Sequence, residues 1–159
     1  MNSSTPTGPQ SVLLIGYGNP YRQDDRVGHV VAEQAASRCR AQGHGAVRCL
    51  TAYQLDLDMV EDLASVDRVY FIDAHTPEYS SEVELQPVAP AAPDGFTTHV
   101  FSPAHLVHLA GTLYGSAPDA FILSIPGQTF DMGDDLSPGT ARAAEEAVKL
   151  LLQHLHGAG

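Results

Sequence analysis

The sequence has 159 residues but no tryptophan, two cysteines and only eight lysines and arginines. Set against 19 aspartates and glutamates, this shortage of basic residues gives a formal net charge of −11. Nucleic acids and anionic membrane surfaces require a basic footprint, so we expect neither as a partner. The acidic balance is compatible with a cationic ligand or a basic peptide, although acidity is also a common solubility feature.

Long hydrophobic runs are missing as well. No apolar run approaches the ~18 residues of a membrane-spanning helix, so no membrane insertion is expected. The first ten residues, MNSSTPTGPQ, lack the basic and apolar regions of a signal peptide, and we interpret residues 1–10 as a flexible tail. Cys39 and Cys49 lie too far apart for a zinc motif. We expect both to be reduced in a cytoplasmic, monomeric protein.

Strand-like and helix-like segments alternate over residues 11–156, which predicts one α/β domain. Segments 11–15, 47–50, 68–72 and 121–125 are short and apolar, as core strands are. Segment 82–88 alternates in polarity and follows 68–72 too closely for a helical crossover, which predicts an antiparallel edge strand. We therefore expect a twisted, mostly parallel sheet of about five strands with helices on both faces.

Four segments show helical patterns: about 26–42, with Gly43 placed to end it, 57–63, 102–113, and 138 onward. The last two start with Ser-Pro, which is typical of an N-cap followed by proline at the first helical position. Right-handed crossovers would place strands 11–15 and 68–72 side by side at the sheet centre. Ligands bind beyond the carboxyl ends of such strands, so the residues there are candidates for a site.

The first strand leads into GYGNPYRQDD, a glycine-containing turn that ends in Asp24 and Asp25. Glycine turns at this place often hold phosphate, but two carboxylates repel phosphate and attract a cation. Tyr21 also stands where a dinucleotide-binding turn needs glycine, which makes a nucleotide site a weak alternative. Aspartate is a common N-cap, so either carboxylate could cap the following helix while the other acts as a ligand.

Asp73 follows the apolar strand RVYFI, and His99 stands in TTHVFSP just before a predicted helix. Because Asp25 and Asp73 both follow parallel strands, they can share one cleft at the carboxyl edge of the sheet. Two carboxylates and one imidazole, with positions left open, can hold a divalent ion. The alternative for Asp73 is a strand-end residue that hydrogen-bonds to the next turn.

Other histidines compete with this assignment. His75 would share a face with Asp73 if the strand continued, but Pro77 favours an earlier end, so we expect a peripheral position for His75. His105 and His108 are spaced for chelation on a helix, yet their apolar setting is typical of partly exposed helix residues. We expect the two histidines near the C-terminus, His154 and His156, to face solvent. No serine or cysteine stands in a nucleophile motif.

Taken in order, the motifs GYGNPYRQDDRVG, VYFIDA, TTHVFSP and LSPGTARAAEEAV resemble those of the hydrogenase maturation endopeptidases, over roughly residues 12–152. The resemblance implies a twisted sheet flanked by helices. It also implies a metal-binding and catalytic triad, which falls on Asp25, Asp73 and His99 in this sequence.

The resemblance implies further residues around the triad. Gly18 and Asn19 match the turn that shapes the site, and Asp24 completes the acidic pair. Gln54 matches a short QL motif and is a candidate for the wall of the site. Arg26 stands where the family usually has glycine; it could bind a substrate carboxylate or point to solvent.

The implied function is removal of the C-terminal extension of the [NiFe]-hydrogenase large-subunit precursor. The implied cofactor is nickel supplied by that precursor, although other divalent ions could occupy the site. Two other functions are left open by the residues: a non-catalytic metal-sensing chaperone for the same precursor, and a carboxylate and histidine metallohydrolase that acts on small amides.

Overall fold

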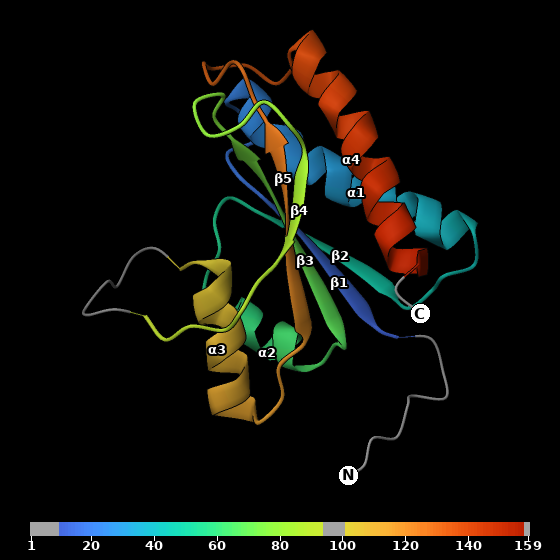
Figure 1. Cartoon of the computed structure of the whole chain (residues 1–159), viewed down its shortest axis with the longest axis vertical. Coiled ribbons are helices and arrows are strands. Elements are labelled where there is room, and N and C mark those ends of the chain that lie inside the picture. Colours follow the sequence, from blue (N-terminus) through green and yellow to red (C-terminus); the bar gives the residue numbers. More distant parts are fainter. Residues whose placement is uncertain (1–9, 94–100, 158–159) are drawn as a thin grey trace.

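A five-stranded sheet covered by helices on both faces forms the fold (Figure 1). The computed structural model describes residues 10–93 and 101–157. The strands are β1 (Val12–Tyr17), β2 (Val47–Ala52), β3 (Arg68–His75), β4 (Glu84–Pro87) and β5 (Asp119–Pro126). The helices are the short 3₁₀ helix η1 (Gln23–Arg26), α1 (Val27–Ala41), α2 (Met59–Ala64), α3 (Pro103–Tyr114) and α4 (Pro138–Gly157).

The strand order is β2-β1-β3-β5-β4, and β4 is the antiparallel member, at the edge beside β5. This order confirms the predicted mostly parallel sheet, its antiparallel edge strand, and the central pairing of β1 with β3. The carboxyl ends of the parallel strands all lie toward the top of the molecule in Figure 1. The loops after β1, β3 and β5 come together there, which is the edge where a site was expected.

Three element boundaries differ from the sequence prediction. β3 does not end at Ile72, as the nearby Pro77 favoured, but continues to His75, because Ala74 and His75 still pair with β5. β4 is shorter than the expected 82–88, since its paired register runs only from Glu84 to Pro87. α2 is also short and begins at Met59, which leaves Leu57, the first residue of the predicted helix 57–63, outside it and 52% exposed.

Two apolar layers enclose the sheet. α1 and α4 pack on one face, against the side chains of Leu14, Tyr70 and Leu123. α2 and α3 pack on the other face, where Leu13 and Phe71 alternate with the first set. Both central strands are therefore buried on both sides, as their unbroken apolar runs predict.

The start of α1 presses directly against the strands through two glycines. A Cβ on Gly28 would lie 2.3 Å from the Ile72 carbonyl oxygen and 3.0 Å from that of Tyr17. A Cβ on Gly16 would lie 2.2 Å from the Gly28 carbonyl oxygen. Only glycine fits at such distances, and the close approach holds η1 over the ends of β1 and β3.

The predicted helix signals near Ser102 and Ser137 are confirmed. The Ser102 hydroxyl accepts a hydrogen bond from the His105 backbone N–H at 3.2 Å, and the His105 ring completes the capping box. The Ser137 carbonyl oxygen accepts from the Ala141 N–H at 2.8 Å, in the first turn of α4. Gly43 adopts a φ of 83° directly after α1, as expected of a residue that ends a helix.

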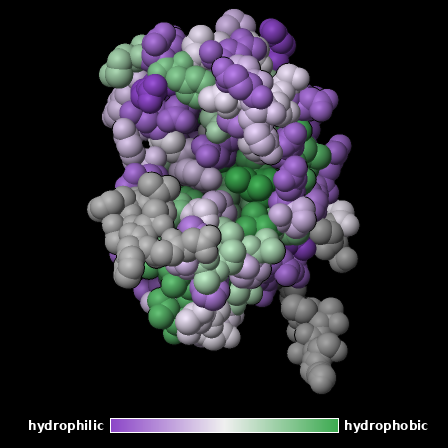
Figure 2. Space-filling model, turned by 60° about the vertical axis from the view of Figure 1, so that its left-hand side comes forward, coloured by the Kyte–Doolittle hydropathy of each residue, from purple (hydrophilic) through white to green (hydrophobic). Residues whose placement is uncertain are grey.

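The surface is mixed rather than uniformly polar. Hydrophilic residues predominate in the upper part of Figure 2, whereas hydrophobic residues gather in a hollow at mid-height. Of the residues that the structure describes, no helix combines the length and apolar character needed to cross a membrane. Both Cys39, which is buried, and Cys49, which is half-buried, are free thiols.

The expectation that His154 faces solvent is wrong. This half-buried side chain lies 2.6 Å, Nδ1 to Oη, from the buried Tyr70 hydroxyl, and its ring packs edge-on against Phe121. Burial and the nearby Arg68 guanidinium lower the pKa of His154. His154 thus docks the end of α4 onto the sheet, whereas His156 is exposed as expected.

Candidate functional site

Asp25 and Asp73 meet at the carboxyl edge of the two central strands. Asp73 is the sixth residue of β3, and the pairing of Gly16 with Ile72 brings Tyr17 of β1 beside it. Asp25 lies in η1, and its charge is close enough to raise the pKa of Asp73. The two carboxylates are therefore near enough to interact electrostatically.

The surroundings of Asp73 strongly raise the pKa of its carboxyl group. Burial raises its pKa from 3.8 to about 7, although the Ala74 N–H, at 2.8 Å, donates a hydrogen bond that favours the charged form. The negative charge of Asp25 adds to the rise, and the Tyr17 hydroxyl donates a second hydrogen bond that opposes it. A carboxyl group that titrates near neutral pH can accept or deliver a proton under ordinary conditions.

Tyr17 is a site residue that the sequence prediction missed. Burial and the charge of Asp73 raise the pKa of its phenol, which therefore keeps its proton and donates to the Asp73 carboxylate. Its only signal in the sequence is its place at the end of a core strand, where many residue types occur. Tyr17 therefore holds Asp73 in one orientation.

The turn between β1 and η1 is built around Asp25. The Asn19 backbone N–H donates to the Asp25 carboxylate at 2.7 Å, and the Asn19 side chain accepts from the Tyr21 N–H at 2.9 Å. Gly18 adopts a φ of +140°, and a Cβ there would lie 2.2 Å from the Asp25 carbonyl oxygen. His29 donates from Nε2 to the Gly18 carbonyl oxygen at 2.9 Å. Gly18 and Asn19 therefore both contact Asp25 within this turn.

Asp24 is neither an N-cap of its own helix nor available as a ligand. Its side chain is fully buried and accepts hydrogen bonds from the backbone N–H groups of Gln128, Thr129 and Ser137 at 2.7–2.9 Å. The hydroxyls of Ser137 and Thr140 lie 2.7 and 2.9 Å from its carboxylate. Burial alone would raise its pKa, but these hydrogen bonds outweigh it and lower the pKa to about 2.

The N-cap alternative fails for Asp25 too, since neither η1 nor α1 has a side-chain cap. What Asp24 does instead is fasten the β5–α4 loop and the start of α4 to η1. Its partners stand more than 100 residues away in the sequence, which explains why no local pattern pointed to them.

Arg26 contacts the β5–α4 loop, a partner that the sequence did not indicate. Its guanidinium donates from Nη1 to the Asp134 carbonyl oxygen at 2.7 Å, which ties η1 to the β5–α4 loop. Arg22 does the same nearby, with Nε 2.9 Å from the Phe130 carbonyl oxygen. Arg26 thus reinforces the attachment made by Asp24.

The other candidate residues named from the sequence lie in different surroundings. Gln54 lies exposed in the loop after β2, and its side chain makes no hydrogen bond within the described part of the chain. His75 lies on the same face of β3 as Asp73, but both ring nitrogens are engaged, with the Ser124 hydroxyl at 2.5 Å and the Ser80 carbonyl oxygen at 3.0 Å. His105 serves the cap of α3, and His108 is partly exposed on that helix.

His99 lies outside the described residues, so its place in the triad stays a prediction. Among residues 10–93 and 101–157, no three histidine, cysteine or acidic side chains come together as a metal site. Asp25 and Asp73 nevertheless fit a divalent ion in part, because two adjacent carboxylates supply oxygen ligands and their mutual repulsion is relieved by a cation. Two protein ligands leave positions open for a metal presented by another molecule.

The sequence matches no protein-family profile, and no curated protein sequence matches it. Solved structures do match over nearly the full length. A [NiFe] hydrogenase maturation protease, HycI, from Thermococcus kodakarensis KOD1 has a TM-score of 0.69 at 20% identity, covering 94% of this chain and 95% of that chain. The hydrogenase maturating endopeptidase HybD from E. coli has a TM-score of 0.68 at 18% identity, with 94% of each chain covered.

A hydrogenase 2 maturation peptidase from Thaumarchaeota archaeon SCGC_AB-539-E09 matches as well, at a TM-score of 0.66 and 19% identity, covering 92% of this chain and 98% of that chain. The chain has the fold of the hydrogenase maturation proteases. The resemblance found in the sequence motifs is therefore confirmed at the level of the fold. In this maturation-protease fold, the Asp25–Asp73 pair stands at the carboxyl edge where α/β sheets bind their ligands.

Proposed function

We propose that this protein is an endopeptidase that removes the C-terminal extension of a nickel-loaded [NiFe]-hydrogenase large-subunit precursor. The observation that carries the proposal is the pair of carboxylates, Asp25 and Asp73, which interact electrostatically at the carboxyl edge of the sheet. The fold that holds them is shared with named hydrogenase maturation proteases. Two such carboxylates repel each other and attract a cation. A nickel ion held by the precursor is a cation of the required kind, with His99 as the third proposed ligand.

In this proposal the nickel belongs to the substrate and marks a precursor that is ready to be cut. Bound metal either polarises the scissile carbonyl or lowers the pKa of a water, while a carboxylate takes the proton. Asp25 and Asp73 engage the metal, and the Tyr17 hydroxyl keeps Asp73 oriented toward it. The buried Asp24 carboxylate keeps η1, and therefore Asp25, in a fixed position.

The test is mass spectrometry of a co-expressed large-subunit precursor, with and without this protein, under full nickel loading. The expected result is a shortened precursor only when the protein is present. The variant Asp73→Ala should leave the precursor at full mass. A matched control is Asp119→Ala, because Asp119 is exposed at the first residue of β5, on the opposite edge of the sheet, and should leave cleavage unchanged.

Other outcomes distinguish the alternatives. Trimming at the normal rate by Asp73→Ala would overturn the assignment of the site. A stable complex with a precursor whose mass never changes would instead favour a metal-sensing chaperone. Turnover of small amides without any hydrogenase partner would favour an ordinary metallohydrolase.

A further inference from the structure

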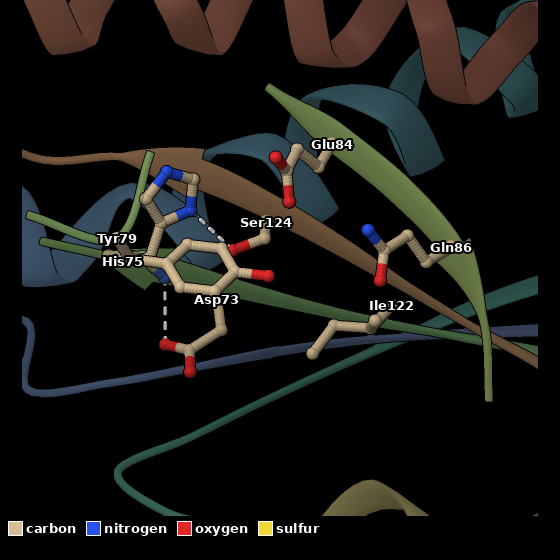
Figure 3. A pocket seen from close by; sticks show the side chains of 8 residues that line it. Asp73, His75, Tyr79, Glu84, Gln86, Ile122 and Ser124 are labelled. Atoms are coloured by element: carbon tan, nitrogen blue, oxygen red, sulfur yellow. Dashed lines mark hydrogen bonds between the residues drawn. The ribbon is translucent and has the colours of Figure 1, made fainter. Parts of the chain in front are cut away.

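Two histidines meet on the surface at the amino edge of the sheet, away from the candidate site. A cavity of about 210 Å³ beside Asp73, shown in Figure 3, adjoins the candidate site and is part of it. His44 instead lies in the loop that leads into β2, and its ring is 4.7 Å from the ring of His156 between centroids. Both side chains are exposed. Two neighbouring imidazoles are the ligands that a transition-metal ion prefers.

The end of α1 fixes the backbone of His44. Gly43, with its φ of 83°, donates from its N–H to the Arg40 carbonyl oxygen at 3.1 Å, and the His44 N–H donates to the Cys39 carbonyl oxygen at 2.8 Å. These two hydrogen bonds form a Schellman motif, which ends a helix in a defined backbone conformation. The chain therefore leaves α1 in one direction at His44.

His156 reaches the same place from the last turn of α4. Its Nε2 lies 3.2 Å from the Oε1 of Gln42, the C-cap residue of α1. Because an amide oxygen only accepts, Nε2 carries the proton of this hydrogen bond. Figure 1 shows the ends of α1 and α4 side by side, in agreement with this contact. Two imidazoles and one amide oxygen thus stand together at the C-terminal ends of two helices.

Helix dipoles favour a cation at this place. α1 has 15 residues and α4 has 20, and each places the negative end of its dipole here. Arg38 and Arg40, in the last turn of α1, act against a bound ion by repulsion. Both are exposed, so water and salt screen that repulsion. The ion itself would lie within the last turn of both helices, where the dipole attraction is strongest.

The separations match those around a single ion. Ligand atoms about 2.1 Å from one ion lie roughly 3.0–3.4 Å apart for angles of 90–109°, and the Nε2–Oε1 distance of 3.2 Å falls within this range. Two imidazole rings on one ion have centroids roughly 4.5–5.2 Å apart for the same angles. The observed 4.7 Å corresponds to an angle of roughly 90–95°, as in the tetragonal geometry of Ni²⁺ and Cu²⁺.

We propose that His44 and His156, with the side-chain oxygen of Gln42, form a second metal site that binds one Ni²⁺ or Cu²⁺ ion. The ion takes the place of the Nε2 proton of His156, and the ring then carries its proton on Nδ1. Water fills the other positions, because the site is exposed. A bound ion joins the α1–β2 loop to the end of α4.

This metal site is separate from the Asp25–Asp73 pair. At about 1.5 Å per residue, the 15 residues of α1 place it roughly 22 Å from the start of that helix, where Asp25 stands. Among the described residues, no third histidine, cysteine or carboxylate joins the two imidazoles, and the amide oxygen of Gln42 takes that position.

The test is calorimetric titration of the full-length chain, without a histidine tag, with NiCl₂. The background variant is Asp25→Asn with Asp73→Asn, which lacks the proposed carboxylate site. It should bind one ion per chain. Adding His44→Ala or His156→Ala should weaken the binding by about tenfold or more, because each removes one of the two imidazoles.

The matched control is His108→Ala, which removes a partly exposed histidine of α3 and should leave nickel binding unchanged. Unchanged binding after both His44→Ala and His156→Ala would overturn the site. Binding that is lost in His108→Ala instead would place the ion on α3 and overturn it as well. Circular dichroism of each variant without metal should match that of the background, because the replaced side chains are exposed or partly exposed.

A second readout reports the ligands themselves. One Cu²⁺ per chain, bound to the same background, should show coupling to two imidazoles in pulsed electron paramagnetic resonance, and His44→Ala should leave one. Two coupled imidazoles in His44→Ala would overturn the site even where the affinity falls, since the loss would then come from an altered structure. Neither measurement uses the precursor, so the result is independent of the proposed peptidase function.

Discussion

Burial of the Asp73 carboxyl costs stability in the metal-free protein at neutral pH. Its pKa of about 7 in the folded state exceeds the unfolded value of 3.8, so between these values the folded state binds more protons. This contribution to stability is fully present below pH 4 and is lost as the pH rises through about 7. At about 1.4 kcal/mol for each pKa unit, the loss is on the order of 4 kcal/mol.

The variant Asp73→Asn should therefore be more stable than the unchanged protein at pH 8, and much less so at pH 5. Asparagine cannot ionise, and its side-chain oxygen can still accept from the Ala74 N–H. Urea unfolding of metal-free protein at both pH values measures the difference. Asp119→Asn serves as the exposed control. The same stability difference at pH 5 and pH 8 would contradict the raised pKa.

Asp24 illustrates the opposite balance between burial and hydrogen bonding. Asn in its place would turn an amide group toward the N–H donors of Gln128, Thr129 and Ser137, leaving donors unpaired. We expect Asp24→Asn to lower the free energy of unfolding by about 2–4 kcal/mol. Asp25→Asn, whose carboxylate accepts from the Asn19 N–H, should cost less. Similar losses for both variants would argue against the special role of Asp24.

The lowered pKa of Asp24 also predicts a pH dependence. Its folded value of about 2 lies below the unfolded value of 3.8, so its contribution is present above pH 4 and is lost as the pH falls toward 2. Acid unfolding followed by circular dichroism should therefore show a loss of stability between pH 4 and 2 that is smaller in Asp24→Asn. An identical acid profile for both proteins would contradict this assignment.

At the scale of elements, the contact of α1 with β1 and β3 depends on glycine. A Cβ on Gly28 would lie 2.3 Å from the Ile72 carbonyl oxygen, and backbone atoms cannot yield as a flexible side chain can. Gly28→Ala should cost about 3 kcal/mol or more, measured by urea unfolding. Gly111→Ala is the control: it lies inside α3 with Ala117 Cβ 3.7 Å away, and should stabilise by about 0.5–1 kcal/mol. A tolerated Gly28→Ala would contradict the close packing.

Local patterns predicted most of these elements because the physical signals are local too. The apolar run of β3 and the Ser-Pro cap of α3 each carry their own evidence within a few residues. The predicted end of β3 was wrong because pairing with β5, which is distant in the sequence, overrides the local effect of Pro77. The predicted start of α2 at Leu57 was wrong for a similar reason, because helical spacing alone does not determine where a short helix begins.

At the scale of the whole molecule, topology accounts for the part of the site that the sequence predicted. Asp25 and Asp73 follow neighbouring parallel strands, and such ends always meet at one edge. Tyr17 and the partners of Asp24 escaped prediction because their roles depend on register and on contacts across the chain. Each of these residues acts by holding another group in place, and such roles leave no short sequence pattern.

The same pair of carboxylates links metal binding to the stability of the whole molecule. Nickel that binds only the folded state adds RT ln(1 + [Ni]/Kd), about 2.7 kcal/mol at a hundredfold excess over Kd. We therefore expect Ni²⁺ to raise Tm at pH 8, and a chelator to reverse the effect. Because the ion competes with the proton on Asp73, whose pKa is about 7, the rise should shrink toward pH 5.

Surface histidines could also bind nickel, since the chain has eight of them. The double variant Asp25→Asn with Asp73→Asn separates the two sources, because it keeps every histidine and removes both carboxylates. Its Tm should rise much less with nickel at pH 8, and the remaining rise measures the histidine contribution. An undiminished rise in the double variant would place the metal elsewhere and remove the main support for substrate nickel at this edge of the sheet.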